Sequence, residues 1–112
     1  MSKAYSLNHI NELSGGDQEF TTVLVQTFLE EIPPDLDSML EAVKSDNPGL
    51  EYQYAHKMKP NLQLFGIELL TQIKQVEAWA KADKDKDQIL PTIEYIVKTV
   101  NEAIEDLKND FQ

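Results

Sequence analysis

The apolar residues of this chain recur every three or four positions almost from end to end. The clearest run consists of Ile89, Ile93, Ile96, Val97, Val100, Ile104 and Leu107. This spacing places the apolar side chains on one face of an α-helix, whereas a half-buried strand needs strict alternation. No such alternation is sustained over six residues. The chain is therefore predicted to be all-α.

The first two helices are bounded by capping residues and a glycine turn. We expect a short first helix capped by Ser6, and a second helix capped by Asp17 after the turn at 14–17. The second helix is expected to continue through Pro33–Pro34 with a kink, because its apolar stripe keeps its phase. The residues of that stripe are Phe20, Val23, Leu24, Thr27, Phe28, Ile32, Leu36, Met39, Leu40 and Val43.

Three further helices complete the predicted fold. Asn47–Pro48 marks the start of the third helix, which is expected to reach about Phe65 before a break at Gly66. A polar loop at 81–87 separates the fourth helix from a fifth at 88–107. The inner face of the fourth helix is expected to hold Leu69, Leu70, Ile73, Val76, Trp79 and Ala80. Short connections between long helices favour an up-down-up-down four-helix bundle with a short extra N-terminal helix.

The composition limits the size of the protein and the class of its partners. A chain of 112 residues is expected to form one domain over residues 1–112. Twenty acidic residues against ten lysines give a net charge of −10, so nucleic acid and anionic membranes are poor partners. The absence of cysteine excludes disulfides and thiolate zinc sites. Because we find neither a signal-peptide core nor a long apolar run, we expect a cytoplasmic location and no membrane span.

His56 lies on the polar side of the predicted third helix. At 100° per residue it is about 160° from Met58, which shares the apolar face with Tyr54, Leu62 and Phe65. The histidine is therefore expected to face solvent. Lys59 follows one turn later on the same side, so its ammonium group can approach whatever the imidazole carries.

Two further features distinguish this helix from an ordinary exposed helix. Residues 50–75 hold three lysines and two acidic residues, so this segment has a net charge of +1 and the remainder has −11. Pro60 lies inside the predicted helix and has no N–H to donate to the His56 carbonyl, a loss of about 3 kcal/mol if uncompensated. Such breaks in a local rule are often found at functional sites.

The residues around His56 resemble the signature of histidine phosphotransfer domains, the HPt modules of multistep phosphorelays. In that family a lysine follows the histidine after three residues and a glycine after ten, which here are Lys59 and Gly66. The sequences Leu-Ser-Gly-Gly-Asp at 13–17 and Phe-Leu-Glu-Glu-Ile-Pro at 28–33 are also similar to the family, and the resemblance covers about residues 7–107. Pro60 departs from the glycine that usually follows the lysine.

The resemblance implies that the chain is a phosphorelay intermediate. His56 would accept a phosphoryl group from the aspartyl phosphate of a receiver domain and pass it to another receiver. Lys59 would offset the phosphoryl charge. The Mg²⁺ needed for transfer would belong to the receiver, so the chain itself would need no cofactor. It has no glycine-rich phosphate loop, so we expect a phosphotransfer intermediate and not a self-contained kinase.

Because the histidine would enter another protein's active site, the surface around it is expected to dock that protein. The residues expected there are Tyr52, Gln53, Lys57, Pro60, Gln63 and Gly66. Gly66 would permit close packing at this surface. The implied partners are receiver domains of response regulators or of a hybrid histidine kinase, and the chain is expected to act as a monomer. The alternative is a helical module that docks a receiver or another partner without carrying phosphate.

Other candidate sites are weaker. Residues 83–94 place carboxylates at positions 1, 3, 5 and 12, as in an EF-hand loop. Gln88 stands where the loop needs glycine and Pro91 occupies position 9, so a solvated loop is the preferred interpretation. His9 is expected at the surface and Trp79 in the core. We therefore expect no metal site.

Overall fold

A computed structural model describes residues 4–82 and 86–111 of the chain, and most of these residues are helical. The helices are α1 (Asn8–Ser14), α2 (Gln18–Lys44), α3 (Pro48–Leu64), α4 (Leu70–Ala82), the short 3₁₀ helix η1 (Lys86–Gln88) and α5 (Leu90–Phe111). Within the described ranges there is no β-strand. The prediction of an all-α protein is confirmed.

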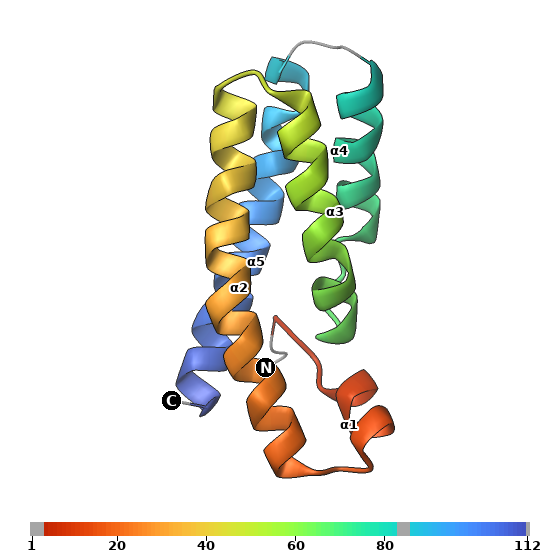
Figure 1. The fold of residues 1–112 in the computed structure, drawn as a ribbon, viewed down its shortest axis with the longest axis vertical. Helices are drawn as coiled ribbons and strands as arrows, with labels where there is room; N and C mark the ends of the chain where they lie inside the picture. Colours follow the sequence, from red (N-terminus) through yellow and green to blue (C-terminus); the bar gives the residue numbers. More distant parts are fainter. Residues whose placement is uncertain (1–3, 83–85, 112) are drawn as a thin grey trace.

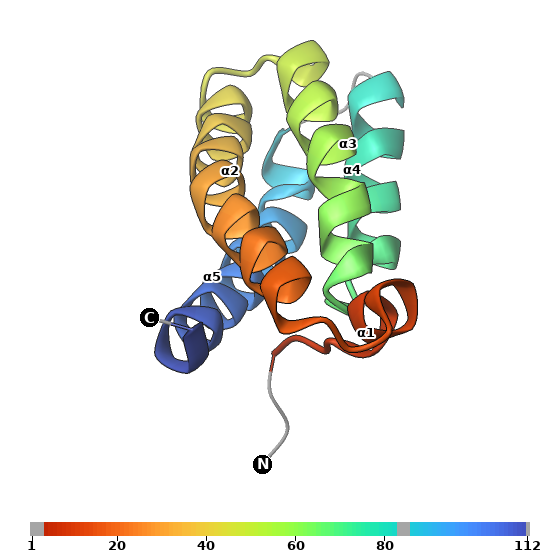
Figure 2. The ribbon, with the colours of Figure 1, turned by 60° about the horizontal axis from the view of Figure 1, so that its bottom comes forward.

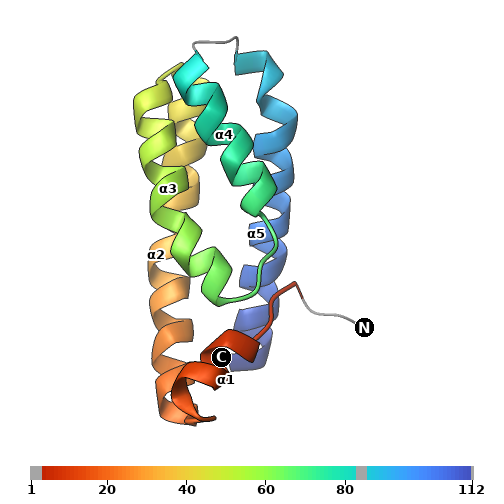
Figure 3. The ribbon, with the colours of Figure 1, turned by 90° about the vertical axis from the view of Figure 1, so that its right-hand side faces the viewer.

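The four long helices lie side by side and alternate in direction, with α2 and α4 rising in Figure 1 and α3 and α5 descending. α3 packs against α2 and α4, and α5 packs against the same two helices. The body is elongated along the helices, with extents of 45 × 25 × 23 Å. α1 lies across the lower end, where Figures 2 and 3 show it below α3 and beside the start of α2.

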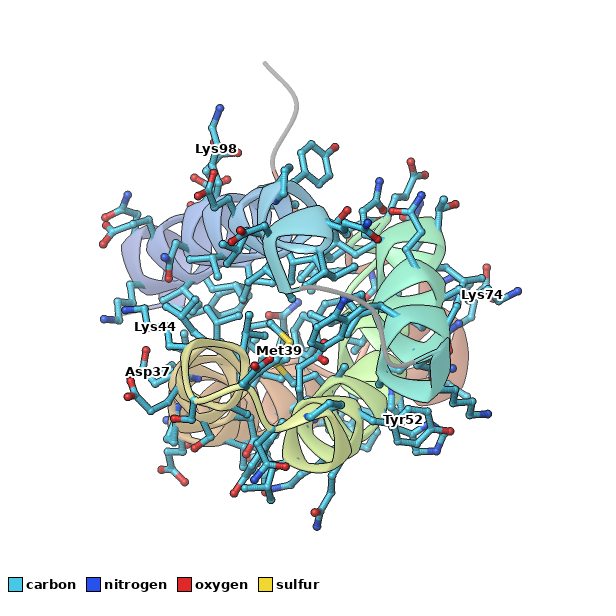
Figure 4. All side chains as sticks on the ribbon, turned by 90° about the horizontal axis from the view of Figure 1, so that it is seen from above. Asp37, Met39, Lys44, Tyr52, Lys74 and Lys98 are labelled. Carbon is cyan, nitrogen blue, oxygen red and sulfur yellow. The ribbon has the colours of Figure 1, made fainter. Side chains whose placement is uncertain are left out.

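The apolar faces of these helices meet in one core. Met39 lies in the middle of this core when the helices are viewed along their axes, whereas Asp37 and Lys74 point outward (Figure 4). The Phe28 and Phe65 rings pack in a tilted arrangement with their centroids 4.6 Å apart. Burial of an apolar side chain of this size contributes about 1.5–3 kcal/mol relative to an exposed one. Packing in this core therefore stabilises the arrangement of the helices, and the polar side chains on their outer faces are exposed to solvent.

The expected caps of α2 and α3 are present. Asp17 Oδ1 accepts a hydrogen bond from the Glu19 N–H at 3.0 Å, and Asn47 Oδ1 accepts one from the Leu50 N–H at 3.2 Å. Each bond satisfies an amide that the first turn of a helix leaves without a partner. Pro48 occupies the first turn of α3, as predicted.

The prediction that Ser6 caps α1 is wrong by one residue. The N-cap residue is Leu7, and its side chain makes no capping hydrogen bond. Ser6 lies before the helix, and its N–H donates to the Phe65 carbonyl at 2.7 Å. Its hydroxyl oxygen still accepts from the Asn8 N–H at 3.2 Å.

α2 is a single helix through Pro33 and Pro34, as predicted. In Figure 1 its lower half leans away from the line of its upper half. The predicted phase is wrong in its first turns, where Phe20 and Val23 are 40% and 60% exposed. The buried face there contains Thr21 and Val25, which share the phase of the core residues further along. The Thr21 hydroxyl is satisfied by donating to the Asp17 carbonyl at 3.1 Å.

Several predicted boundaries shift by a few residues. α3 ends at Leu64, and α5 begins at Leu90 and continues past the expected end at Leu107 to Phe111. Leu70, predicted to face the core, is 41% exposed because α4 begins there and Leu69 takes the inner position.

Within the predicted loop at 81–87, residues 81–82 complete α4, and residues 86–88 form η1. Residues 83–85, which carry the first carboxylates of the EF-hand-like pattern, lie outside the described residues. Across the described ranges, no helix has both the length and the apolar character needed to cross a membrane.

Candidate functional site

His56 lies near the middle of α3 with its side chain 62% exposed. Met58 and Leu62 are buried on the opposite face of this helix. The predicted exposure of the histidine is therefore confirmed. The helix also continues past Pro60 to Leu64, as expected. Because proline has no N–H, the His56 carbonyl lacks its usual helical donor.

The imidazole of His56 contacts a carboxylate on the neighbouring helix. Glu77 projects from α4, and its Oε2 lies 3.1 Å from His56 Nδ1. The other oxygen, Oε1, accepts a hydrogen bond from Lys59 Nζ at 3.0 Å. The Glu77 and Lys59 side chains are only 14% and 23% exposed. One largely buried carboxylate thus joins the two residues that the sequence singled out on α3.

The charge state of Glu77 determines which nitrogen of His56 is free. Burial acts to raise the pKa of this carboxyl, but hydrogen bonds from His56 and Lys59 and their charges outweigh burial, so its pKa is lowered. An ionised carboxylate only accepts hydrogen bonds, so His56 Nδ1 carries the proton of this contact. In the neutral imidazole the lone pair then lies on Nε2. Nε2 is the nitrogen available to an incoming electrophile.

An aromatic ring lies beside the imidazole in a parallel, offset arrangement. Tyr52 lies one turn before His56, and the two rings are almost parallel, at 6°, with centroids 5.7 Å apart. Lys81 of α4 places its ammonium nitrogen 5.3 Å from the centre of the Tyr52 ring. Figure 4 shows Tyr52 at the outer edge between α3 and α4. The histidine thus has a hydrogen-bond partner in Glu77 and a parallel aromatic neighbour in Tyr52.

Lys57 lies on the other side of α3 from Lys59. Its ammonium group donates to Asp35 Oδ1 of α2 at 3.0 Å, and the Asp35 side chain is 8% exposed. This hydrogen bond and the Asp35 charge raise the pKa of Lys57. The side chain remains 57% exposed, but its charge is paired within the molecule. Lys57 therefore links α2 to α3 beside the histidine.

Gly66 permits a close approach, but the group that approaches is part of this chain. Its backbone has a φ of +65°, and a Cβ there would lie 2.7 Å from the Ser6 Cβ. Left-handed backbone and this contact together require glycine. From the sequence, this close packing was expected to involve a partner protein. In the structure, Ser6 of the N-terminal segment occupies this space.

An open groove of about 870 Å³ lies on the same side of α3, between its C-terminal end, α1 and the start of α4. Leu13 and Leu70 on its lining are 71% and 41% exposed. Its other lining residues include Pro60, Gln63, Leu64, Gly66, Ile67, Glu12, Glu68 and His9. The groove begins one turn below the histidine, since Pro60 is four residues from His56. Gln53, also expected on the docking surface, is exposed on α3.

Glu77 was not predicted from the sequence. Its position on α4, about 100° from the buried Val76, places it on the flank of the apolar face. This position was the one sign in the sequence that Glu77 could contact a neighbouring helix. Periodicity shows that flank but not which neighbouring helix it meets. His9 is exposed and Trp79 is buried, as expected. In the part of the chain that the structure describes, no three histidine or carboxylate side chains gather as a metal site would need.

Comparisons of the chain with models of protein families, with curated proteins and with solved structures found no match.

Proposed function

We propose that this protein is a phosphorelay intermediate of the HPt kind and that its long helices form an up-down-up-down four-helix bundle with α1 as a short extra helix. His56 accepts a phosphoryl group from the aspartyl phosphate of a receiver domain and passes it to another receiver. One observation carries the proposal, namely an exposed imidazole whose Nδ1 contacts the buried Glu77 carboxylate, which also binds Lys59. A surface histidine without a function would not require a contact with a largely buried carboxylate.

The proposed transfer balances without further reactants. The Nε2 lone pair of His56 attacks phosphorus, the bond between phosphorus and the aspartyl oxygen breaks, and its electron pair stays on the receiver's carboxylate. The Nδ1 proton remains in the hydrogen bond to Glu77, whose negative charge offsets the positive character of the phosphorylated ring. The reverse sequence delivers the phosphoryl group to the second receiver.

Lys59 supplies positive charge at the site. Its ammonium group is held by Glu77 at 3.0 Å, one helical turn from the histidine. A phosphoryl group on His56 brings additional negative charge, so Lys59 can share its hydrogen bonds between the carboxylate and the phosphoryl oxygens. Mg²⁺ and the acidic residues of the reaction belong to the receiver.

The partner is proposed to dock on α3 and on the groove below it. The docking surface includes Gln53 and Lys57, which are exposed on α3, and Pro60, Gln63 and Gly66, which line the groove. It extends to the apolar side chains exposed in the groove. These apolar side chains lie beside the acceptor, where burial against a partner favours association. We further propose that the protein acts as a monomer in the cytoplasm, where it meets its receivers.

The test is transfer from labelled receivers. Receiver domains from the same cell, phosphorylated on aspartate with radioactive phosphate, are mixed with the wild-type protein and with His56→Gln and His9→Gln variants. Label is expected on the wild type and on His9→Gln but not on His56→Gln. The linkage is expected to be acid-labile and base-stable, as for a phosphoramidate. Label on His56→Gln would show that another residue is the acceptor.

The exposed apolar groove also suits the alternative function, a docking module that carries no phosphate. Both functions need the groove, and only the relay needs His56, Glu77 and Lys59 to converge. A protein that binds receivers in calorimetry but takes no label from any of them would establish the docking module. Replacement of Leu13 by lysine is then expected to weaken binding, because a charge replaces an exposed apolar contact.

A further inference from the structure

Tyr52 has contacts that a docking residue does not need. It is partly buried, its ring is stacked on His56, and Lys81 lies over its ring. Tyr52 and His56 are one turn apart on α3, and Lys81 and Glu77 are one turn apart on α4. The two helices therefore face each other through two successive contacts, Tyr52 with Lys81 and His56 with Glu77.

These contacts restrain the imidazole in different directions. The hydrogen bond from Nδ1 to Glu77 acts in the plane of the ring. A hydrogen bond alone permits the ring to tilt about the donor–acceptor line, because hydrogen-bond angles are broadly distributed. The Tyr52 ring, parallel to the imidazole within 6°, opposes that tilt. Together the two contacts restrain the direction in which Nε2 points.

We infer that Tyr52 is a positioning residue for phosphoryl transfer, which holds the His56 ring so that Nε2 faces the incoming phosphorus. This role presupposes the transfer proposed above. It differs from docking because it acts on the nucleophile and not on the partner. In-line attack at Nε2 occurs in the plane of the ring, so a residue stacked on the face does not obstruct it. Lys81 holds Tyr52 in place through its contact with the ring.

The experiment compares Tyr52→Leu and Tyr52→Phe with the wild type, with Tyr95→Leu as the matched control. Tyr95 lies on α5 and is 52% exposed. Labelling is measured with a phosphorylated receiver over a range of concentrations and with phosphoramidate, a small donor that needs no docking surface. Nitrogen NMR measures the fraction of neutral His56 that carries its proton on Nδ1, which does not depend on any phosphoryl transfer.

Tyr52→Leu is expected to lower the maximal rate about two- to tenfold with both donors, with the half-saturating receiver concentration unchanged. It is also expected to lower the Nδ1–H fraction of His56. Tyr52→Phe, which keeps the ring, and Tyr95→Leu are expected to match the wild type in both measurements.

Three outcomes would overturn this role for Tyr52. The first is a Tyr52→Leu variant whose only change is a higher half-saturating receiver concentration, since that identifies a docking residue. The second is a Tyr52→Phe variant as slow as Tyr52→Leu, since that assigns the effect to the hydroxyl. The third is an unchanged Nδ1–H fraction in Tyr52→Leu. If neither donor labels the wild type, the proposed function fails, and the NMR comparison still decides whether Tyr52 positions the ring.

Discussion

The carboxylate of Glu77 lies 3.1 Å from Nδ1 of His56, across the interface between α4 and α3. The acid is largely buried and the imidazole is largely exposed, so the contact joins the interior of the protein to its surface. A carboxylate in this position selects the tautomer of a histidine and orients its ring. In the proposed transfer, the reactivity of the exposed nitrogen therefore depends on a side chain that is itself largely buried.

Replacement of Glu77 by glutamine is expected to lower the rate of phosphoryl transfer to His56 about tenfold. The amide removes the negative charge that offsets the phosphorylated ring, and its NH₂ group can donate to Nδ1 and so favour the wrong tautomer. The rate is measured with a labelled receiver. Glu102→Gln, an exposed acid of α5 outside the proposed docking surface, is the control and is expected to transfer normally. Full activity in Glu77→Gln would remove this residue from the mechanism.

Replacement of Lys59 by alanine is expected to slow transfer about tenfold without abolishing it, because Lys59 supplies charge and not the attacking atom. Lys59→Arg keeps the charge and is expected to recover part of the rate. Lys74→Ala, which removes an exposed lysine of α4, is expected to have no effect. Initial rates at saturating receiver measure the difference. Complete loss in Lys59→Ala with the helical content intact would contradict the assigned role.

Replacement of Gly66 by alanine is expected to destabilise the protein by about 1–2 kcal/mol or more, because of its positive φ, with a further loss from the contact with Ser6. Gly49 offers a matched control. It lies in the first turn of α3, and the nearest atom to an added Cβ is Asn47 Oδ1 at 3.8 Å. Gly49→Ala is expected to be neutral or stabilising. Urea denaturation measures both, and equal stabilities for the two variants would contradict this account.

Glu51 is expected to make the stability of the protein depend on pH. Its side chain is fully buried in the first turn of α3, and neither carboxyl oxygen has a hydrogen-bond partner among the described residues. Burial raises the pKa of Glu51 from 4.5 to about 7. The native state therefore binds this proton more tightly than the unfolded state. Its contribution to stability is complete below about pH 4.5 and is lost as the pH rises through 7, a change of about 3 kcal/mol.

The Glu51→Gln variant isolates this effect, since it removes the titration and keeps the shape. The free energy of unfolding, measured in urea at pH 5 and at pH 8, is expected to fall less between these values than in the wild type. Glu94→Gln, an exposed acid of α5, is expected to leave the pH dependence unchanged. Parallel pH profiles for Glu51→Gln and the wild type would show that Glu51 is ionised at little cost.

Local features of the fold followed from the sequence because they depend on neighbours along the chain. The capping side chains of Asp17 and Asn47 each accept a hydrogen bond from an N–H no more than three residues further along, so the residue types suffice to predict these caps. The orientation of His56 followed from the phase of a single helix. The phase of α2 was predicted less well, because Phe20 and Val23 are apolar and yet lie where no helix covers them.

The sequence by itself determined the helices, most of their buried faces and the exposure of His56 with Lys59 one turn away, since a helix specifies positions within one segment. Only the tertiary structure decided that Glu77 joins these two residues, that Lys57 pairs with Asp35 and that Ser6 lies against Gly66. Each of those contacts joins segments whose relative position depends on how the apolar faces pack. Helical periodicity shows which face of a helix is buried. Which residues of a neighbouring helix contact the edges of that face depends on how the side chains of the two helices pack together.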